Sequence, residues 1–299
     1  MGPIFVIHNH KGFSMKRSLL ARLRSNGFNY LISGLILLLG VPLYQVLILG
    51  STGFSSALDE TGSGRYAAYL IWISTHSLLF VIYRVLLLGA FFLLLTFPFA
   101  LQRIIVAQEL LGLQERAETQ ASEDNAIDTT ANPDTIETED DTTDSDDMTE
   151  HPWRGKGFVV LAGWAGLLGL AIYLIGGALS TGYFVLVGGS TGSAIHNSVT
   201  VLAPIFTIIT NAVGTGLLGL ACLFFGAMIV RTGKIFWPDS WVFFGYTALF
   251  VGAILCISAV AVVSAAGIGQ STLTTIATWL LAIWIIWLGC MLIRLKPEP

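Results

Sequence analysis

The chain has 299 residues, of which 54% are hydrophobic and only 11% are charged, and its mean hydropathy is +0.75. So few charges cannot cover the surface of a soluble protein, so the composition excludes a soluble globular class and indicates a polytopic membrane protein. The formal net charge of -4 hides a segregation, because residues 115–150 carry fourteen carboxylates and one arginine.

The first 28 residues are basic and precede the first apolar stretch. That stretch, Tyr30 to Leu49, is about twenty residues long, which suits an uncleaved transmembrane helix better than the shorter core of a signal peptide. The segment MKRSLLARLRS at Met15 has the character of a natural start, so the true start is left open between Met1 and Met15. We expect this basic segment, residues 1–28, to lie in the cytoplasm.

Six stretches are long and apolar enough to cross a hydrocarbon core of about 30 Å. They are Tyr30 to Leu49, Leu78 to Leu101, Phe158 to Leu179, Val201 to Val230, Val242 to Ala266, and Leu273 to Ile293. The predicted fold class is therefore all-α: a membrane bundle of six transmembrane helices, arranged as three hairpins. Its segments are a two-helix part (29–114), a linker (115–156) and a four-helix part (157–299).

The distribution of basic residues predicts the orientation. With six spans and a cytoplasmic N-terminus, thirteen of the fifteen Lys/Arg fall on the cytoplasmic side. A seventh span, made by splitting the second stretch at Arg84, would move six of them outside, against the positive-inside rule. We therefore expect a multi-pass protein of the cell membrane with both termini and the linker cytoplasmic, and residues 66–77 at the outer interface.

Residues 115–156 form an acidic linker with almost no apolar side chains, which predicts disorder. Its Thr/Asp/Glu runs, such as TETEDDTTDSDDMTE, resemble in composition the membrane proteins of salt-in halophilic archaea. That resemblance covers the linker only and implies no functional residues. The linker is either a solvated spacer or a binding segment for a basic cytoplasmic partner. Lipid and a helix-helix partner or second copy of the chain are the other expected partners, and nucleic acid is not.

The ends of the even-numbered spans are similar in sequence. LLGLACLFFGAMIVR at Leu217 to Arg231 aligns without gaps with LLAIWIIWLGCMLIR at Leu280 to Arg294, and FPFALQR at Phe97 is a weaker third copy. This pattern indicates either internal duplication, as in many transporters, or independent apolar helices that each end in an arginine. Proline residues also interrupt three spans, at Pro42, Pro98 and Pro204, where we expect kinks.

The spans lack the residues of several functional classes. No Asp or Glu falls inside them, which disfavours carboxylate proton relays, acidic sodium sites and paired-carboxylate hydrolases. The segment GAMIVRTGKIF at Gly226 does not have the spacing of a phosphate loop, and the three cysteines have no metal-binding spacing. We therefore predict no catalytic residue, no metal site and no cofactor.

The remaining polar residues near the outer ends of the spans define a candidate binding site. Thr207, Asn211 and Thr215 are spaced four residues apart on one helix face, and a polar row in hydrocarbon must face other helices or a cavity. Six residues make up the predicted outward-facing pocket: His76, Arg84, His196, Thr207, Asn211 and Thr215, with Thr275 and Thr278 as possible neighbours. The competing interpretation is ordinary hydrogen bonding between helices, with Arg84 extending to headgroups or pairing inside the bundle.

Three Ser-Thr-Gly stretches, at Ser51, Ser180 and Ser190, follow apolar runs. We predict outer exit loops at all three, because these residues cap helix ends without charge. For the function, the absence of catalytic or coupling groups favours a non-enzymatic membrane component: an accessory subunit, scaffold or sensor. A small-solute permease or channel-like transporter is the alternative, and an intramembrane enzyme that uses His76 or His196 is the least favoured.

Overall fold

The computed structural model describes residues 17–59, 65–108, 156–188, 193–264 and 272–294. These residues are helical almost throughout and contain no strand. Six of the helices are long and apolar enough to cross a membrane: Arg22–Thr52, Ser77–Gln108, Gly157–Gly188, Ser198–Gly233, Asp239–Ser264 and Thr272–Arg294. The predicted all-α, six-span membrane bundle is confirmed. Most of the predicted linker lies outside the described residues.

The first two spans are each built from several helical pieces. The first consists of α1 (Arg17–Leu35), η1 (Ile36–Gly40), α2 (Val41–Leu43), η2 (Tyr44–Leu49) and η3 (Gly50–Thr52). Two short helices follow, α3 (Phe54–Asp59) and α4 (Arg65–Thr75). The second span is α5 (Ser77–Leu93), a turn at 94–96 and a helix over 97–108.

The other four spans are more regular. They are α7 (Lys156–Gly188), α8 (Ser193–Thr207) with η4 (Ile208–Gly214) and α9 (Thr215–Phe236), α10 (Asp239–Ser264) and α11 (Thr272–Arg294). The α7 helix extends nine residues past the predicted end at Leu179. The apolar stretch Tyr183 to Val187 therefore belongs to α7.

Each predicted proline interruption coincides with irregular backbone. Pro42 lies between the π-helical segments η1 and η2, and Pro204 precedes the π-helical η4 by four residues. Pro98 is the second residue of the helix that follows the turn at 94–96. Proline has no N–H to donate and crowds the preceding turn, so the hydrogen-bond register of the helix changes nearby.

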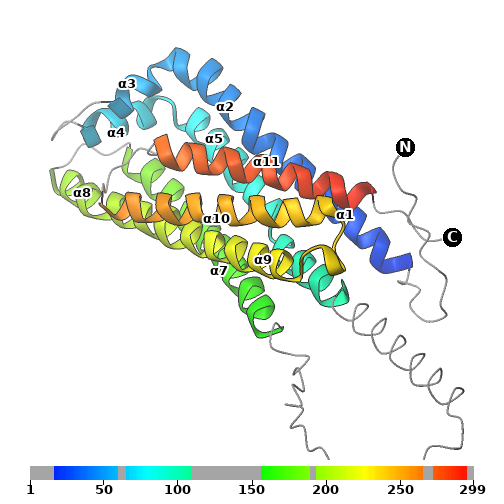
Figure 1. Cartoon of the computed structure of the whole chain (residues 1–299). Coiled ribbons are helices and arrows are strands. Elements are labelled where there is room, and N and C mark those ends of the chain that lie inside the picture. The colour runs from blue at the N-terminus through cyan, green and yellow to red at the C-terminus, as the bar shows by residue number, and fades with distance from the viewer. Residues whose placement is uncertain (1–16, 60–64, 109–155, 189–192, 265–271, 295–299) are drawn as a thin grey trace, which may run out of the picture.

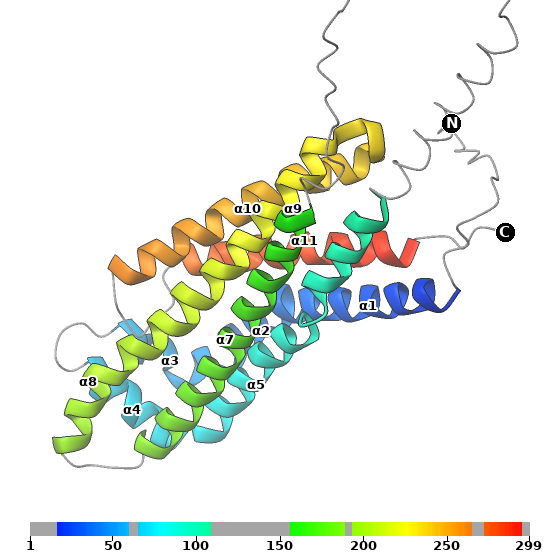
Figure 2. The ribbon, with the colours of Figure 1, turned by 90° about the horizontal axis from the view of Figure 1, so that it is seen from below.

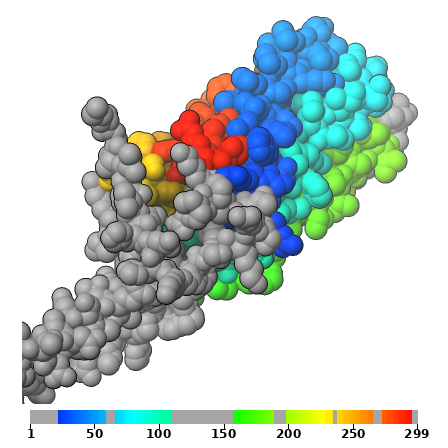
Figure 3. Space-filling model, turned by 90° about the vertical axis from the view of Figure 1, so that its right-hand side faces the viewer, coloured from blue at the N-terminus to red at the C-terminus, as the bar shows by residue number. Residues whose placement is uncertain are grey.

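The six spans alternate in direction and form a closed ring. Its order is α1, α11, α10, α9, α7, α5 and back to α1, with each helix packed on the next (Figure 2). The space-filling view shows the surface of α1 between α11 and α5, which closes the ring (Figure 3). Exposed Arg22, Arg103, Arg231 and Arg294 stand at one end, called here the basic end. Helices α3, α4 and α8 lie at the opposite end (Figure 1).

The closest helix pairs in the ring meet through glycine. Between α9 and α10, a Cβ atom added to Gly252 would lie 2.7 Å from the Gly219 carbonyl oxygen, and one added to Gly226 would lie 2.7 Å from that of Gly245. Such distances leave no space for a side chain. Small residues at these crossings let the backbones approach closely, which strengthens dispersion contacts in an apolar solvent.

The pair α11 and α1 repeats this arrangement. A Cβ atom on Gly289 would lie 2.8 Å from the Gly27 carbonyl oxygen, and one on Gly34 would lie 2.9 Å from that of Ala282. In the sequence alignment of the even spans, Gly226 corresponds to Gly289. The aligned glycines therefore make equivalent contacts, each with an odd-numbered span.

The second and third spans form the third such pair, although with larger residues. Pro98 takes the position of Gly226, and a Cβ atom on Gly166 would lie 2.9 Å from the Pro98 Cγ atom. Seven residues from Pro98, in the direction away from the basic end, lies Phe91. Its ring and that of Tyr173 occupy the positions where the other pairs have small residues, and their centroids are 4.2 Å apart. In this pair, therefore, two aromatic rings take the place of the small residues at the crossing.

The equivalence extends to the pattern of burial. In the odd spans six buried positions recur at equivalent places, beside others that do not: Leu23, Gly27, Tyr30, Gly34, Leu37 and Val41; Ala162, Gly166, Gly169, Tyr173, Gly176 and Ser180; Trp241, Gly245, Ala248, Gly252, Leu255 and Ala259. In the even spans they are Ala90, Phe91, Leu94, Phe97, Pro98 and Leu101; Leu218, Gly219, Cys222, Phe225, Gly226 and Ile229; Leu281, Ala282, Ile285, Leu288, Gly289 and Leu292. The repeated contacts favour internal duplication over unrelated apolar helices.

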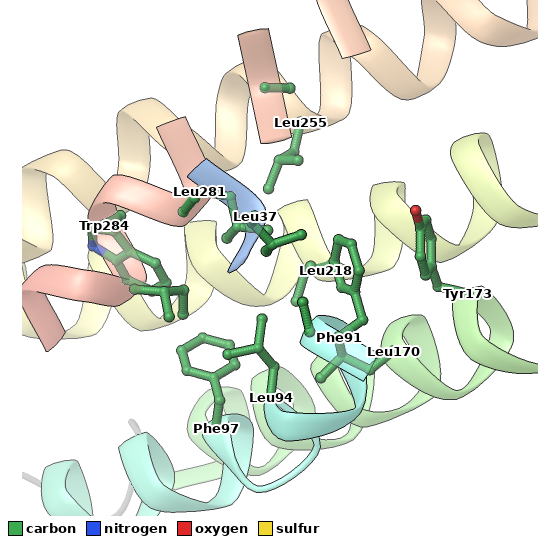
Figure 4. Packing of buried hydrophobic residues seen from close by; sticks show 14 of the residues in the cluster. Leu37, Phe91, Leu94, Phe97, Leu170, Tyr173, Leu218, Leu255, Leu281 and Trp284 are labelled. Atoms are coloured by element: carbon green, nitrogen blue, oxygen red, sulfur yellow. The ribbon is translucent and has the colours of Figure 1, made fainter. Parts of the chain in front are cut away.

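Large apolar side chains fill the middle of the ring. Figure 4 shows residues from all six spans pointing toward one another, among them Leu37, Phe97, Leu170, Leu255 and Trp284. Around Phe97, the ring centroid of Trp284 lies at 5.5 Å, that of Phe225 at 6.2 Å and that of Tyr30 at 6.4 Å. These aromatic rings come from four spans, so the half of the bundle nearer the basic end is packed and apolar.

Candidate functional site

The most unusual side chain in the bundle is Arg84, which lies two turns into α5 and is only partly exposed. Its Nη2 donates a hydrogen bond to Ser180 Oγ of α7 at 3.3 Å, and its guanidinium carbon lies 5.5 Å from the centroid of the Phe80 ring. The Nε atom is buried and has no hydrogen-bond partner among the described residues. Arg84 therefore turns toward α7, which is the second of the two interpretations above, with Ser180 as its partner.

Three buried tyrosines lie within electrostatic range of this arginine: Tyr69 of α4, Tyr83 of α5 and Tyr173 of α7. Arg84, Ser180 and these tyrosines are called here the Arg84 cluster. Burial raises the pKa of the Tyr69 phenol to about 12, although the charge of Arg84 acts in the opposite direction. The phenols are neutral at physiological pH, so they supply hydroxyl groups and no counter-charge.

The Arg84 cluster sits at the pair of spans that differs from the other two. The positions equivalent to Arg84 are Ala212 and Thr275, and those equivalent to Ser180 are Ala259 and Val41. On the basic-end side of Arg84, Tyr173 of the cluster packs against Phe91, at the position where the other pairs have glycine or alanine. The guanidinium itself points from α5 to α7, where Nη2 bonds to Ser180.

His76 lies apart from this cluster, where it starts α5. Its ring stacks on Trp72 with the centroids 5.2 Å apart, and its Nδ1 lies 2.8 Å from Thr75 Oγ1. All three residues belong to one chain segment at the junction of α4 and α5. These local contacts account for His76 as a residue of the helix junction.

The predicted polar row of the fourth span lies in α8, η4 and the start of α9. Thr207 Oγ1 donates to the Ala203 carbonyl at 2.9 Å, Thr210 Oγ1 donates to the Phe206 carbonyl at 2.7 Å, and Thr215 Oγ1 donates to the Asn211 carbonyl. Each hydroxyl is thus satisfied within its own helix. Asn211 is half-buried, at the position equivalent to buried Tyr83 and Thr274. His196 belongs to α8, and its side chain lies outside the described part of the structure.

Thr275 and Thr278 lie at a different place, in a groove between the first and sixth spans. The groove has a volume of about 230 Å³ and is lined by Leu37, Val41, Pro42, Gln45, Val46, Leu87, Thr275, Thr278 and Trp279. It occupies the part of the α11 and α1 pair away from the basic end, at the level equivalent to the Arg84 cluster. Of the predicted residues, Arg84 therefore lies in its own cluster, His76 at the junction of α4 and α5, Thr207, Asn211 and Thr215 in the fourth-span row, and Thr275 and Thr278 in this groove.

Sequence reasoning missed Ser180, Tyr69 and Tyr173. The Ser-Thr-Gly stretch at Ser180 was predicted to be an exit loop, but it lies inside α7, where Ser180 is buried and donates to the Gly177 carbonyl at 2.9 Å. The stretch at Ser51 does end a helix, because Ser51 and Thr52 cap carbonyls and Gly53 adopts a φ of 79°. The stretch at Ser190 lies outside the described residues.

The chemistry of the Arg84 cluster is that of binding. Among the described residues, no group of three His, Cys, Asp or Glu side chains lies close enough to hold a metal ion. The cluster offers a cation and several hydroxyl groups, which suit an anionic group and supply neither a strong nucleophile nor a general base.

No protein-family model, curated protein or solved structure matches this chain. The function is therefore inferred from the geometry of the bundle and the chemistry of its polar residues.

Proposed function

We propose that this protein is a non-enzymatic membrane component: an accessory subunit, scaffold or sensor. The observation that carries the proposal is the packed centre of the six-span ring. Large side chains from all six spans meet there, and aromatic rings from four spans pack together around Phe97. A solute path needs a continuous line of polar groups or space, and the aromatic cluster around Phe97 interrupts any such line.

The polar groups of the bundle support a binding or sensing role. Arg84, Ser180, Tyr83, Tyr173 and Thr274 lie in the half away from the basic end. Polar interior on one side and apolar packing on the other is the arrangement expected of a protein that receives a signal or ligand at one face without passing it through.

A small-solute permease is the second candidate, and one observation favours it. The first, second and fourth spans are irregular near Pro42, Pro98 and Pro204, and broken helices often line substrate sites in transporters. For transport, however, the aromatic cluster would have to separate by several ångströms in a second conformation. The one acidic residue of the described spans, Asp239, stands at the basic end of α10, so the interior of the spans offers no acidic group to couple such a movement to an ion gradient.

The orientation and the acidic linker belong to the same proposal. We place the basic end in the cytoplasm, since exposed arginines end the spans there and the positive-inside rule orients them. The linker then joins the second and third spans on the cytoplasmic side, where its fourteen carboxylates are available to a basic partner.

Gentle purification of full-length protein and of a variant lacking residues 117–150, both from the native membrane, tests this proposal. We expect a defined membrane partner in constant stoichiometry with the full-length chain, and its loss by at least about tenfold when the linker is removed, because the acidic contacts are absent. A control variant keeps the linker length and replaces its carboxylates with Asn and Gln. Equal recovery of the partner with all three proteins would exclude the linker as the binding segment, and recovery of no partner would contradict the accessory-subunit form of the proposal.

A further inference from the structure

We propose that the Arg84 cluster binds an anionic group, a phosphate or carboxylate, that reaches the bundle from the end opposite the basic end. The inference does not depend on the linker or its partner. It rests on the charge of Arg84, on its unused donors, on the hydroxyl groups around it and on its depth in the bundle.

Arg84 carries its positive charge inside the second span. A guanidinium in a transmembrane segment is costly, and such residues pair with an opposite charge or face water. Among the described spans the one acidic residue is Asp239, the first residue of α10 at the basic end. The described contacts of Arg84 are Ser180 and the Phe80 ring, with neutral phenols within electrostatic range. An anion from outside the chain would therefore supply the only opposite charge at this site among the groups that the structure describes.

Arg84 uses few of its hydrogen-bond donors within the described structure. Arginine has five N–H donors in a planar fork that matches phosphate and carboxylate oxygens. Arg84 gives one of them to Ser180 Oγ at a long distance, 3.3 Å, while its Nε is buried without a partner among the described residues. Leaving a buried donor of a charged group unsatisfied is unfavourable. Because Nε is fully covered, the terminal nitrogens of Arg84, whose one described hydrogen bond is to Ser180, are the donors that an oxyanion would meet first.

Around the arginine, the pair α5 and α7 departs from the packing of the other two equivalent pairs. Of the three equivalent span pairs, only the pair α5 and α7 has two aromatic rings, Phe91 and Tyr173, at the position where the others have Gly219 with Gly252 and Ala282 with Gly34. The same pair alone carries a charge one to two turns further along. A departure from the repeated packing together with a charge indicates a site with its own function.

The position of Arg84 along the second span sets its depth in the membrane. The second and third spans are each 32 residues long, or about 48 Å, which exceeds a hydrocarbon core of about 30 Å by roughly 9 Å at each end. Arg84 lies seven residues, about 10 Å, from the start of α5, so it is close to the boundary between hydrocarbon and headgroups. Neighbouring Ile82 and Val85 are exposed on the lipid-facing side. Both a lipid headgroup and a free anion could reach this level.

The test uses the full-length protein in an uncharged detergent, with thermal unfolding followed during titration with phosphatidylglycerol, phosphatidylcholine or inorganic phosphate. We expect an anionic compound to raise the unfolding temperature and phosphatidylcholine to have no such effect. Arg84→Gln should weaken the apparent affinity by at least about tenfold, since a charge-assisted hydrogen bond is lost. Tyr69→Phe, which keeps the ring packing, should weaken it by about twofold to fivefold.

The matched control is Arg103→Gln, an exposed arginine at the basic end of the same span, which should leave the response unchanged. Stabilisation by phosphatidylglycerol alone identifies a lipid headgroup as the ligand, and stabilisation by inorganic phosphate as well identifies a free anion. If Arg84→Gln does not fold, the proposal is tested by the other two variants. Weaker anion binding by Tyr69→Phe with unchanged binding by Arg103→Gln would support it. No response to either anion, or an equal response in the cluster variants and the wild type, would overturn the proposal.

Discussion

Replacement of Gly252 by leucine is expected to destabilise the protein strongly, because this glycine lies at the crossing of α9 and α10. An added Cβ atom would lie 2.7 Å from the Gly219 carbonyl oxygen, 2.9 Å from the Leu223 amide nitrogen and 2.8 Å from the Leu223 Cγ atom. Two of these are backbone atoms of α9 and cannot rotate away, so α9 and α10 must separate along their length. Overpacking of this kind costs about 3 kcal/mol or more. Thermal unfolding and the yield of monodisperse protein in detergent measure the effect.

Gly89→Leu is the control for Gly252→Leu, because Gly89 is also in the middle of a span but has no atom within 4 Å of an added Cβ. Its position is exposed and faces lipid. A leucine there should change the unfolding temperature little, or raise it slightly through better helix propensity. Similar losses in both variants would show that the α9 and α10 contact does not have the geometry described.

Truncation of Phe97 to alanine is expected to have the second-largest effect. The Phe97 side chain is fully buried, and its ring contacts Tyr30, Phe225 and Trp284 from three other spans. Its equivalents, Phe225 and Leu288, are also fully buried. Removal of the ring opens a cavity where four helices meet, and such changes cost about 3 to 5 kcal/mol in closely packed cores. The expected result is a marked fall in unfolding temperature without loss of helix content at low temperature.

The same helical span offers a matched control for this truncation. Phe92 is 63% exposed on the lipid-facing side of α5, so Phe92→Ala removes an identical ring without opening an internal cavity. It should alter stability by less than about 1 kcal/mol. An effect of Phe92→Ala equal to that of Phe97→Ala would mean that general hydrophobicity, and not the central packing, determines stability.

The six spans could be predicted from the sequence because the length and hydropathy of a span are local properties. The alignment of Leu217 to Arg231 with Leu280 to Arg294 also identified equivalent glycines, Gly226 and Gly289, before their contacts were known. The partners of those glycines were not predictable. Gly245 and Gly27 lie on different odd-numbered spans, and helix periodicity does not state which helix a small-residue face will meet.

The candidate site could be predicted only in part. Arg84 was identifiable because a charge inside an apolar span is rare. Its neighbour Ser180 was hidden in a Ser-Thr-Gly stretch that has the composition of a loop, yet Ser and Thr are tolerated inside transmembrane helices when they bond to a preceding carbonyl, as Ser180 does with Gly177. Tyr69 and Tyr173 come within electrostatic range of the arginine from α4 and α7, which only the folded structure brings beside α5.

Solute flux through purified protein in sealed vesicles tests most directly whether the six-span bundle is closed, as we propose, and passes no solute. Stopped-flow light scattering with small neutral solutes, together with ion-flux dyes, would compare vesicles that contain the protein with protein-free vesicles. The packed cluster around Phe97 predicts identical rates in the two preparations. Protein-dependent flux that saturates with solute concentration would contradict the proposal and establish the permease function in its place.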